Sequence, residues 1–302
     1  MAKYEHEVTS EEYGLTINQI LKRNFAFSAR FKTKMKYQAL VDLNGTPTPG
    51  YVKPEVGDII GVRLPEESSH FEPQDIPLDI IYEDSDILLI NKQSGVIVHP
   101  TKGHPDHTIA NGLMKYIDES DQSFKIRFAN RIDMDTTGIV IVAKNSNAQN
   151  SLANQMRCNT VVKKYIALAE GDISDDHFEI DLPIGRPAPE SIRRSVMNVE
   201  DGAKEARSEF NVLERYDSDK YGKFTLVEVI LHTGRTHQIR VHLSHIGHPI
   251  AGDALYEGAG DLISRQALHA YYIEFDHPHT NERVSFKAAM PQDMKAALDS
   301  LE

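Results

Sequence analysis

The stretch that decides the fold is Asn130-Arg131-Ile132-Asp133-Met134-Asp135-Thr136-Thr137-Gly138, which leads into Ile139-Val140-Ile141-Val142-Ala143-Lys144. An uninterrupted apolar run of this length, opened by a glycine and closed by a lysine, predicts a strand buried on both faces. An arginine, two carboxylates and two hydroxyls stand where the chain reaches that strand. Buried charge is costly unless it is paired and hydrogen-bonded, so a carboxylate at this position has either a structural partner or a chemical task.

The composition is that of an ordinary globular protein large enough for two domains, with 302 residues, 40% hydrophobic and 26% charged. The net charge of −12, from 33 basic and 45 acidic residues, argues against loose, non-specific binding to nucleic acid. Cys158 is the single cysteine, so no disulfide is possible, which favours a reducing, cytoplasmic setting. We expect Cys158 to be a small buried residue, and we find neither a membrane span nor a signal peptide.

Basic residues gather in two regions of this acidic chain. Residues 13–41 contain no Asp or Glu but six basic side chains, and residues 229–252 contain no acid but two arginines and five histidines. Basic patches on an acidic chain indicate an anionic partner that is held at chosen places.

The first patch lies in a segment that predicts a small α/β module. Apolar residues at helical spacing predict a helix over residues 16–23, and Ser28 is the predicted cap of a second helix that runs to Tyr37. Asn44-Gly45 predicts a hairpin turn, and residues 56–60 are predicted to form a closing strand. This layout resembles the S-four type of RNA-binding domain, which we assign to residues 13–67. The resemblance implies that RNA is bound by the six basic side chains, although a solvated basic surface would have the same sequence: Lys22, Arg23, Arg30, Lys32, Lys34 and Lys36.

A polar segment with two prolines, residues 68–76, predicts a linker to a second domain over residues 77–302. Strands are predicted at 87–90, 161–169, 224–231 and 270–275, and helices along the apolar stripes of residues 109–117, 148–156 and 239–246 and from Pro291 onward. Strands and helices alternate without a regular βαβ rhythm. The pattern therefore predicts an α+β domain with a mixed central sheet flanked by helices.

Asp133 and Arg240 are the pair most able to carry chemistry. Each lies close to the end of a predicted buried strand, and an Arg fork keeps a carboxylate charged and oriented. An aimed carboxylate can act as nucleophile or base, although a structural ion pair would look the same in the sequence.

Other interpretations of these residues remain open. Asp133 and Asp135 could form the acid/base pair of a glycosidase. A metal site could be built from histidines, although no nearby carboxylate completes a known metal signature. Tyr165 could be a stacking platform for a base or a half-buried packing residue. The histidines concerned are His232, His237, His242, His245 and His248.

Taken together, these stretches resemble the RluA family of pseudouridine synthases. The family's His-Arg-Leu-Asp-x-x-Thr-Ser-Gly-Leu motif is similar to residues 130–139, and its Lys-x-Tyr-x-Ala-Leu motif to residues 163–168. Its Gly-Arg-Thr-His-Gln-Ile-Arg-Val-His signature is unbroken at residues 234–242. Supporting matches are Lys92 to Pro100, Leu182 to Arg186, Gly252 to Tyr256 and Arg265 to Ala270.

The resemblance implies a largely antiparallel sheet and a role for each motif residue. Asp133 would be the catalytic aspartate, Arg240 its salt-bridge partner, and Tyr165 the tyrosine that stacks on the target base and is a candidate for later proton removal. Arg131 would help to displace the target nucleotide from its stack. Further substrate contacts would come from Thr136, Thr137, Arg235, His237 and Gln238. The chain departs from the family pattern at Asn130 (His), Met156 (Phe) and Asn159 (Arg), and none of these changes involves the aspartate.

The implied reaction detaches uridine at its glycosidic bond, turns the base and rejoins it through C5. It needs no redox step, so we expect no cofactor and no metal. The implied partner is ribosomal or transfer RNA, with no membrane, and we expect a monomer. The alternatives are a non-catalytic RNA-binding or ribosome-assembly factor on the same fold, and a glycosidase or metal enzyme.

Overall fold

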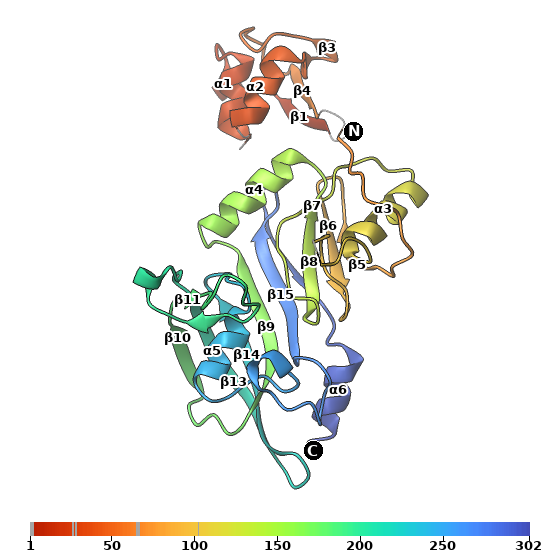
Figure 1. Cartoon of the computed structure of the whole chain (residues 1–302). Helices are drawn as coiled ribbons and strands as arrows, with labels where there is room; N and C mark the ends of the chain where they lie inside the picture. Colours follow the sequence, from red (N-terminus) through yellow and green to blue (C-terminus); the bar gives the residue numbers. More distant parts are fainter. Residues whose placement is uncertain (1–2, 26, 28, 65–66, 102) are drawn as a thin grey trace.

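The computed structural model describes residues 3–25, 27, 29–64, 67–101 and 103–302. Figure 1 shows a small N-terminal module that lies beyond one end of a larger domain, next to helix α4 (Ser146–Arg157). Each part has its own cluster of buried apolar side chains, so each is held together by a separate core.

The N-terminal module packs two helices on a four-stranded sheet with the order β1-β4-β2-β3. Helix α1 begins after Thr16, whose side chain forms a capping box with Gln19, and it buries Ile17, Ile20 and Leu21 against the sheet. The predicted hairpin at Asn44-Gly45 is confirmed, since it joins β2 to β3. The bounds are β1 (Lys3–Glu7), α1 (Ile17–Asn24), α2 (Ala29–Tyr37), β2 (Val41–Leu43), β3 (Thr46–Pro47) and β4 (Ile59–Arg63).

Two predictions about this module are corrected by the structure. Strand β1 precedes the predicted start at residue 13 and pairs with β4, so the sheet begins at Lys3. The closing strand starts at Ile59 rather than at residue 56, because Gly57 adopts a φ of 90° in the turn before it. The predicted cap, Ser28, lies outside the described residues.

The larger domain is built on one ten-stranded sheet with the order β10-β13-β14-β9-β15-β8-β6-β5, to which β16 and β7 add as partners of β15 and β8. All its pairs are antiparallel except β15 with β8. The predicted α+β fold with a mixed, largely antiparallel sheet is therefore confirmed. The strands are β5 (Asp79–Glu83), β6 (Ile87–Lys92), β7 (Arg127–Phe128), β8 (Thr137–Ala143), β9 (Val162–Glu170), β10 (His177–Asp181), β13 (Arg207–Ser218), β14 (Gly222–Leu231), β15 (Leu268–Asp276) and β16 (Arg283–Lys287).

Strand β8, the predicted central strand, is buried along its whole length. Its neighbour β15 comes so close at Gly138 that a Cβ there would lie 2.2 Å from the carbonyl oxygen of Ala270. Gly138 also has a φ of 112°, which side chains rarely adopt. Only glycine fits this position, and it fixes where the polar loop before β8 ends.

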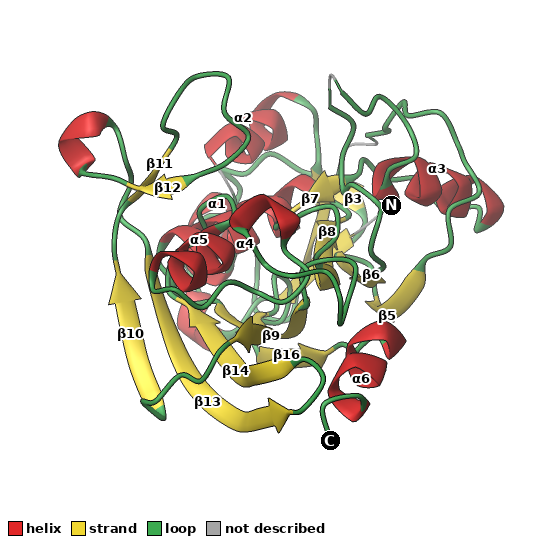
Figure 2. Ribbon diagram, turned by 60° about the horizontal axis from the view of Figure 1, so that its bottom comes forward, coloured by secondary structure: helices red, strands yellow, loops and turns green. Residues whose placement is uncertain are grey.

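The helices pack on the sheet through the apolar residues that predicted them. Figure 2 shows α5 (Gln238–His245) on the curved part of the sheet formed by β13 and β14, and its Ile239 and Leu243 belong to that core. The remaining elements are α3 (Ile109–Glu119), α6 (Gln292–Asp299), the short hairpin of β11 (Ile184–Gly185) and β12 (Ser195–Val196), and three 3₁₀ turns, Ser10–Glu12, Val199–Asp201 and Ala254–Tyr256.

The predicted linker, residues 68–76, contains no helix or strand, but it is bound to the larger domain. The Ser69 hydroxyl accepts a hydrogen bond from the backbone of Ile126, and the Asn111 amide donates to the carbonyl of Glu72. Cys158, at the end of α4, is exposed, so the prediction that it is buried is wrong. No helix in the described part of the chain has the length and apolarity needed to span a bilayer.

Candidate active site

Asp133 lies in the loop that leads into β8, immediately before a turn at Met134 and Asp135. The backbone N–H of Thr136 closes this turn by donating to the carbonyl of Asp133 at 3.2 Å. The carboxylate is 27% exposed, so solvent and ligands reach it.

Arg240, on the first turns of α5, holds this carboxylate. Its Nη1 donates to Oδ2 of Asp133 at 2.9 Å across 107 positions of sequence. On its other side the guanidinium forms a fork with Asp253, with N–O distances of 2.7 and 2.8 Å. Burial disfavours the charge of Arg240, but the hydrogen bonds and charges of Asp253 and Asp133 outweigh it and raise its pKa. The arginine is thus fixed by a buried acid and presents its remaining edge to an accessible one.

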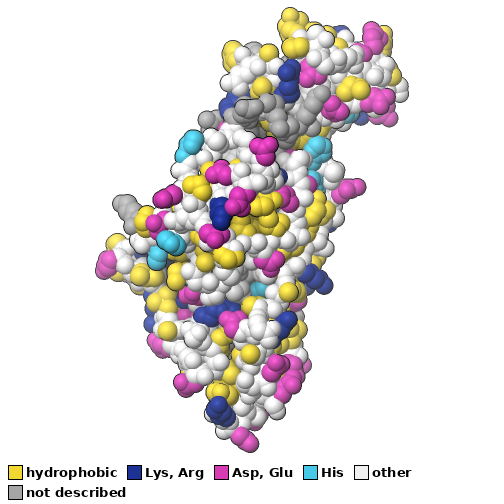
Figure 3. All heavy atoms as spheres, turned by 90° about the vertical axis from the view of Figure 1, so that its right-hand side faces the viewer, with side chains coloured by type: hydrophobic (Ala, Val, Ile, Leu, Met, Phe, Trp, Pro, Cys, Tyr) yellow, Lys and Arg dark blue, Asp and Glu magenta, His cyan; other side chains and the backbone are white. Residues whose placement is uncertain are grey.

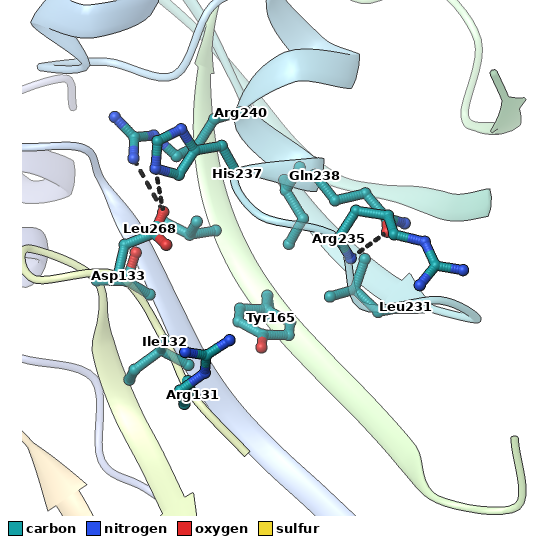
Figure 4. A pocket seen from close by; sticks show the side chains of 12 residues that line it. Arg131, Ile132, Asp133, Tyr165, Leu231, Arg235, His237, Gln238, Arg240 and Leu268 are labelled. Carbon is teal, nitrogen blue, oxygen red and sulfur yellow. Dashed lines mark hydrogen bonds and ion pairs between the residues drawn. The ribbon is translucent and has the colours of Figure 1, made fainter. Parts of the chain in front are cut away.

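The two residues face an open cavity with about 360 Å³ of empty space, part of it open to solvent. Figure 4 shows the Tyr165 ring, from β9, opposite Asp133 in this cavity. Burial and the charge of Asp133 raise the pKa of Tyr165, so the phenol is protonated at neutral pH. Its hydroxyl has no hydrogen-bond partner in the described part of the chain, which leaves it available to a ligand.

His237 forms the third polar wall, with Nε2 at 3.8 Å from Oδ2 of Asp133. It adopts a φ of 58° at the start of α5, and its Nδ1 is 2.9 Å from the hydroxyl of Tyr256. Burial lowers the pKa of His237, with Asp133 acting in the opposite direction. The imidazole is therefore neutral at pH 7, and Arg240 remains the cation that balances Asp133.

The structure brings some of the predicted substrate-binding residues to the cavity and excludes others. Arg131 and Thr136 line it together with Asp133. Thr137 does not, because its hydroxyl is buried against the imidazole of His269 at 2.9 Å. Arg235 and Gln238 border the cavity but are used elsewhere.

Arg235 points away from Asp133 in Figure 4, and its Nε donates to the carbonyl of Glu205. The Gln238 amide accepts from the Thr233 hydroxyl and the Arg235 backbone, and it donates to Ser208 and to the carbonyl of Arg207. These bonds hold the side chain in place at the cavity wall, and a substrate contact from Gln238 stays a prediction.

The alternative constellations are not assembled. Asp135 is not among the residues that line the cavity, and its carboxylate accepts a hydrogen bond from Ser94. His242 is buried between Ser208 and the carbonyl of Leu182, and His248 bonds the carbonyl of Glu170. Among the residues that the structure describes, no group of three or more His, Cys, Asp or Glu side chains is arranged to hold a metal ion.

Sequence reasoning assigned no role to three residues that build the site. Asp253 anchors Arg240, Tyr256 contacts both His237 and the face of Arg240 at 5.1 Å, and Lys92 anchors the loop of Asp133. Two of them lie inside Gly252 to Tyr256, and Lys92 begins Lys92 to Pro100; both segments were noted only as supporting matches. A lone lysine at the end of the apolar run 87–90 was a further signal for the third.

Lys92 is fully buried at the end of β6, and its ammonium group donates to three carbonyls. The acceptors are Gln93 at 2.8 Å, Val96 at 2.9 Å and Met134 at 2.6 Å. The last of these is the residue after Asp133, so Lys92 ties the loop of Asp133 to the sheet. Burial lowers the pKa of Lys92 to about 7, against the raising effect of Asp135 and Asp133.

We expect this depressed pKa to make stability rise with pH. Between the folded pKa near 7 and the unfolded value, the unfolded chain binds more protons at Lys92, so the free energy of unfolding gains roughly 1.4 kcal/mol per pH unit from this group. Urea unfolding of the wild type and of Lys92→Met at pH 7, 8 and 9 measures the effect. The free energy of unfolding of the wild type, minus that of Lys92→Met, should increase from pH 7 to pH 9. A difference that does not change with pH would contradict the assignment.

Comparison with known proteins gives the family of this chain. Residues 86–245 match the family model of RNA pseudouridylate synthase. The chain belongs to this family. The synthase YlyB of Bacillus subtilis is 44% identical over 266 residues, which cover 86% of this chain and 85% of that protein. Ribosomal large subunit pseudouridine synthase D of Vibrio vulnificus is 35% identical over 97% of this chain and 93% of its own length. The resemblance to the RluA family is confirmed, and the chain is an RNA pseudouridine synthase that converts uridine to pseudouridine.

A solved structure agrees with the synthase fold. Human RNA Pseudouridylate Synthase Domain Containing 1 superposes with a TM-score of 0.61 at 28% identity, covering 75% of this chain and 90% of that one. The matched family segment contains Asp133, Tyr165 and Arg240 but ends before Asp253.

Proposed function

We propose that this synthase modifies uridines of large-subunit ribosomal RNA and that Asp133 is its catalytic carboxylate. The observation that supports the site is the partly exposed carboxylate of Asp133 held at 2.9 Å by a buried Arg240, beside a cavity walled by Tyr165. Support for the substrate comes from relatives such as the Vibrio vulnificus protein, which is named for the large ribosomal subunit.

We infer a task for each of these side chains. A uridine in folded RNA has to be flipped into the cavity, at a cost of a few kcal/mol. Arg131, which is exposed at the rim, fills the vacated space in the stack. Tyr165 stacks on the flipped base, and its protonated phenol donates a hydrogen bond rather than serving as a ready base. Asp133 then acts on the sugar as nucleophile or base while the glycosidic bond breaks, the base turns and C5 replaces N1.

The N-terminal module, taken as residues 3–67, supplies a second RNA contact. Arg23 pairs with Glu11 and Lys34 with Glu67. Lys22 and Lys32 are exposed and make no ion pair within the described ranges, so they are the cations of α1 and α2 most free to bind phosphate. The side chains of Arg30 and Lys36 lie outside what the structure describes. On the face drawn in Figure 3, acidic side chains are scattered among basic ones, so the net negative charge forms no single repulsive patch there.

We expect Lys22→Gln/Lys32→Gln to weaken RNA binding and to flatten its salt dependence. Each lost phosphate contact lowers the slope of log K against log salt by about 0.7–0.9, so the double variant should lose roughly 1.5. Filter binding between 50 and 300 mM salt measures the slope. The control is Lys287→Gln/Lys295→Gln, which removes two exposed lysines of the larger domain. Equal slopes in the two double variants would show that the module lysines are only surface.

The substrate is tested by mapping pseudouridine at single-nucleotide resolution in total RNA from cells with and without the gene. Loss of positions confined to large-subunit ribosomal RNA is expected, and loss confined to transfer RNA would overturn the substrate assignment. A non-catalytic assembly factor on this fold predicts an unchanged map. We also propose a cytoplasmic location, on the single cysteine and the RNA substrate.

A further inference from the structure

Strand β1 of the N-terminal module reaches into the larger domain through one side chain, Tyr4. Its ring belongs to the module core, in edge contacts with Phe25 and Phe27 at 5.8 and 5.5 Å between ring centroids. Its hydroxyl donates to Oδ1 of Asp86 at 2.7 Å and accepts from the Asn147 amide at 3.2 Å, and both of these residues are in the larger domain. The ring also stacks on His279, with 4.7 Å between centroids. Tyr4 is therefore shared by the two parts of the molecule.

The receiving site is a buried, hydrogen-bonded carboxylate. Asp86 is 1% exposed, and besides Tyr4 it accepts hydrogen bonds from Asn145, which also caps α4, and from the Ser85 hydroxyl. It stands directly before β6, the strand that ends at Lys92 and pairs with β8. Without Tyr4, this desolvated carboxylate would lose a hydrogen-bond donor that water replaces poorly in a buried position. Burial and the charge of Asp86 raise the pKa of Tyr4, so its hydroxyl keeps the proton that it donates.

A second polar contact joins the same two parts at the end of the module. Glu67 accepts a hydrogen bond from the nearly buried Arg127 of β7 and lies 3.7 Å from the ammonium of Lys34 on α2. Glu67 thus bridges a helix of the module and a strand of the large sheet. Two separate contacts, one at β1 and one at α2, remove the freedom of rotation that a single contact would leave.

We propose that Tyr4 and Glu67 dock the N-terminal module at a fixed position on the catalytic domain, and that this docking determines which uridines of a folded RNA reach Asp133. The inference rests on the proposed function in that it assumes RNA contacts on the module. Figure 1 shows the module at the α4 end of the domain, away from α5, which carries Arg240. A module tied at this place admits only RNAs whose backbone spans that separation, whereas a tethered but mobile module would accept many.

The docking is tested directly by a distance measurement. Cys158 is the single cysteine and is exposed at the end of α4, so it takes a spin label without engineering, and Val56→Cys adds a second site on the exposed surface of the module. Pulsed electron–electron double resonance between the labels at residues 158 and 56 should give one narrow distance distribution. Adding Tyr4→Phe and Glu67→Gln should broaden it. A distribution that is already broad with Tyr4 and Glu67 intact would overturn the proposal.

The effect on specificity is tested with two RNAs, a long ribosomal fragment and a short stem-loop that carries only the target uridine. The Tyr4→Phe/Glu67→Gln variant should lose roughly tenfold in kcat/KM on the long RNA and stay within about twofold on the short one. The Tyr4→Phe change keeps an aromatic ring in the module core, and Glu67→Gln alone leaves that core untouched. The matched control is Tyr13→Phe, at a tyrosine of the module that is 69% exposed. Equal losses on both RNAs would overturn the docking role. Inactivity of the wild type on both would overturn the proposed function instead, and the spin-label distances would still stand as the test of docking.

Discussion

Replacing Asp133 by Asn should abolish pseudouridine formation while leaving the protein folded and able to bind RNA. The amide has the shape of the carboxylate, but it can neither attack a sugar nor accept its proton. We expect a loss on the order of 10³–10⁴-fold or more in single-turnover rate. Arg240 keeps its fork to Asp253 in this variant, so its charge stays paired and the fold is maintained. Tritium release from C5-labelled uridine in RNA measures the rate.

The matched control for this experiment is Asp135→Asn. Asp135 stands two residues away in the same loop, but its side chain faces Ser94 and is not part of the cavity wall. It should stay within a few-fold of the wild type, whereas a glycosidase-like pair would need both carboxylates. Product from Asp133→Asn at the wild-type rate would remove Asp133 from the mechanism and assign the catalytic step to another side chain.

The parts of the molecule that follow from local sequence were predictable. The strand after Gly138 is a run of buried apolar residues, and Ile239 and Leu243 of the predicted stripe bury the helix that carries Arg240. The third residue of that stripe, Ile246, is the exposed C-cap of the helix. The pairing of Asp133 with Arg240 was expected because both lie near the ends of buried strands, where charge requires a partner.

The parts that were missed lack such a local signal. Strand β13 has twelve residues, but a bulge between Val212 and Glu214 shifts its register, so Leu213 is exposed and the alternation of apolar side chains is broken. Among the residues of strand β1 whose burial is described, only Tyr4 is buried, and the strand forms because β4 offers it an edge. The anchor Asp253 is visible only once the helix and the following loop are folded, since nothing in its neighbours marks a buried acid.

Replacing Arg240 by Met should damage both activity and stability, because this one guanidinium serves two carboxylates. Asp253 is 1% exposed, so removal of Arg240 leaves a buried charge with neither of its forked hydrogen bonds. Breaking such a pair costs about 3–5 kcal/mol of unfolding free energy. Asp133, being accessible, gains water in place of the lost bond but is no longer aimed at the cavity, so kcat should fall even in the folded fraction.

Two milder variants separate these effects. Arg240→Lys retains a cation as a single point of charge and cannot bond both acids as a fork does, and Asp253→Asn keeps Arg240 charged while weakening its anchor. In urea, the free energy of unfolding should be highest for the wild type, lower for Arg240→Lys and Asp253→Asn, and lowest for Arg240→Met. Single-turnover rates at saturating RNA should follow the same order. If Arg240→Met were stable and active, the guanidinium would be dispensable to the site. If it were unstable but kept the wild-type rate in its folded fraction, Arg240 would stabilise the fold without positioning Asp133, and the aim of the carboxylate would have to come from the turn at Met134 and from Lys92 alone.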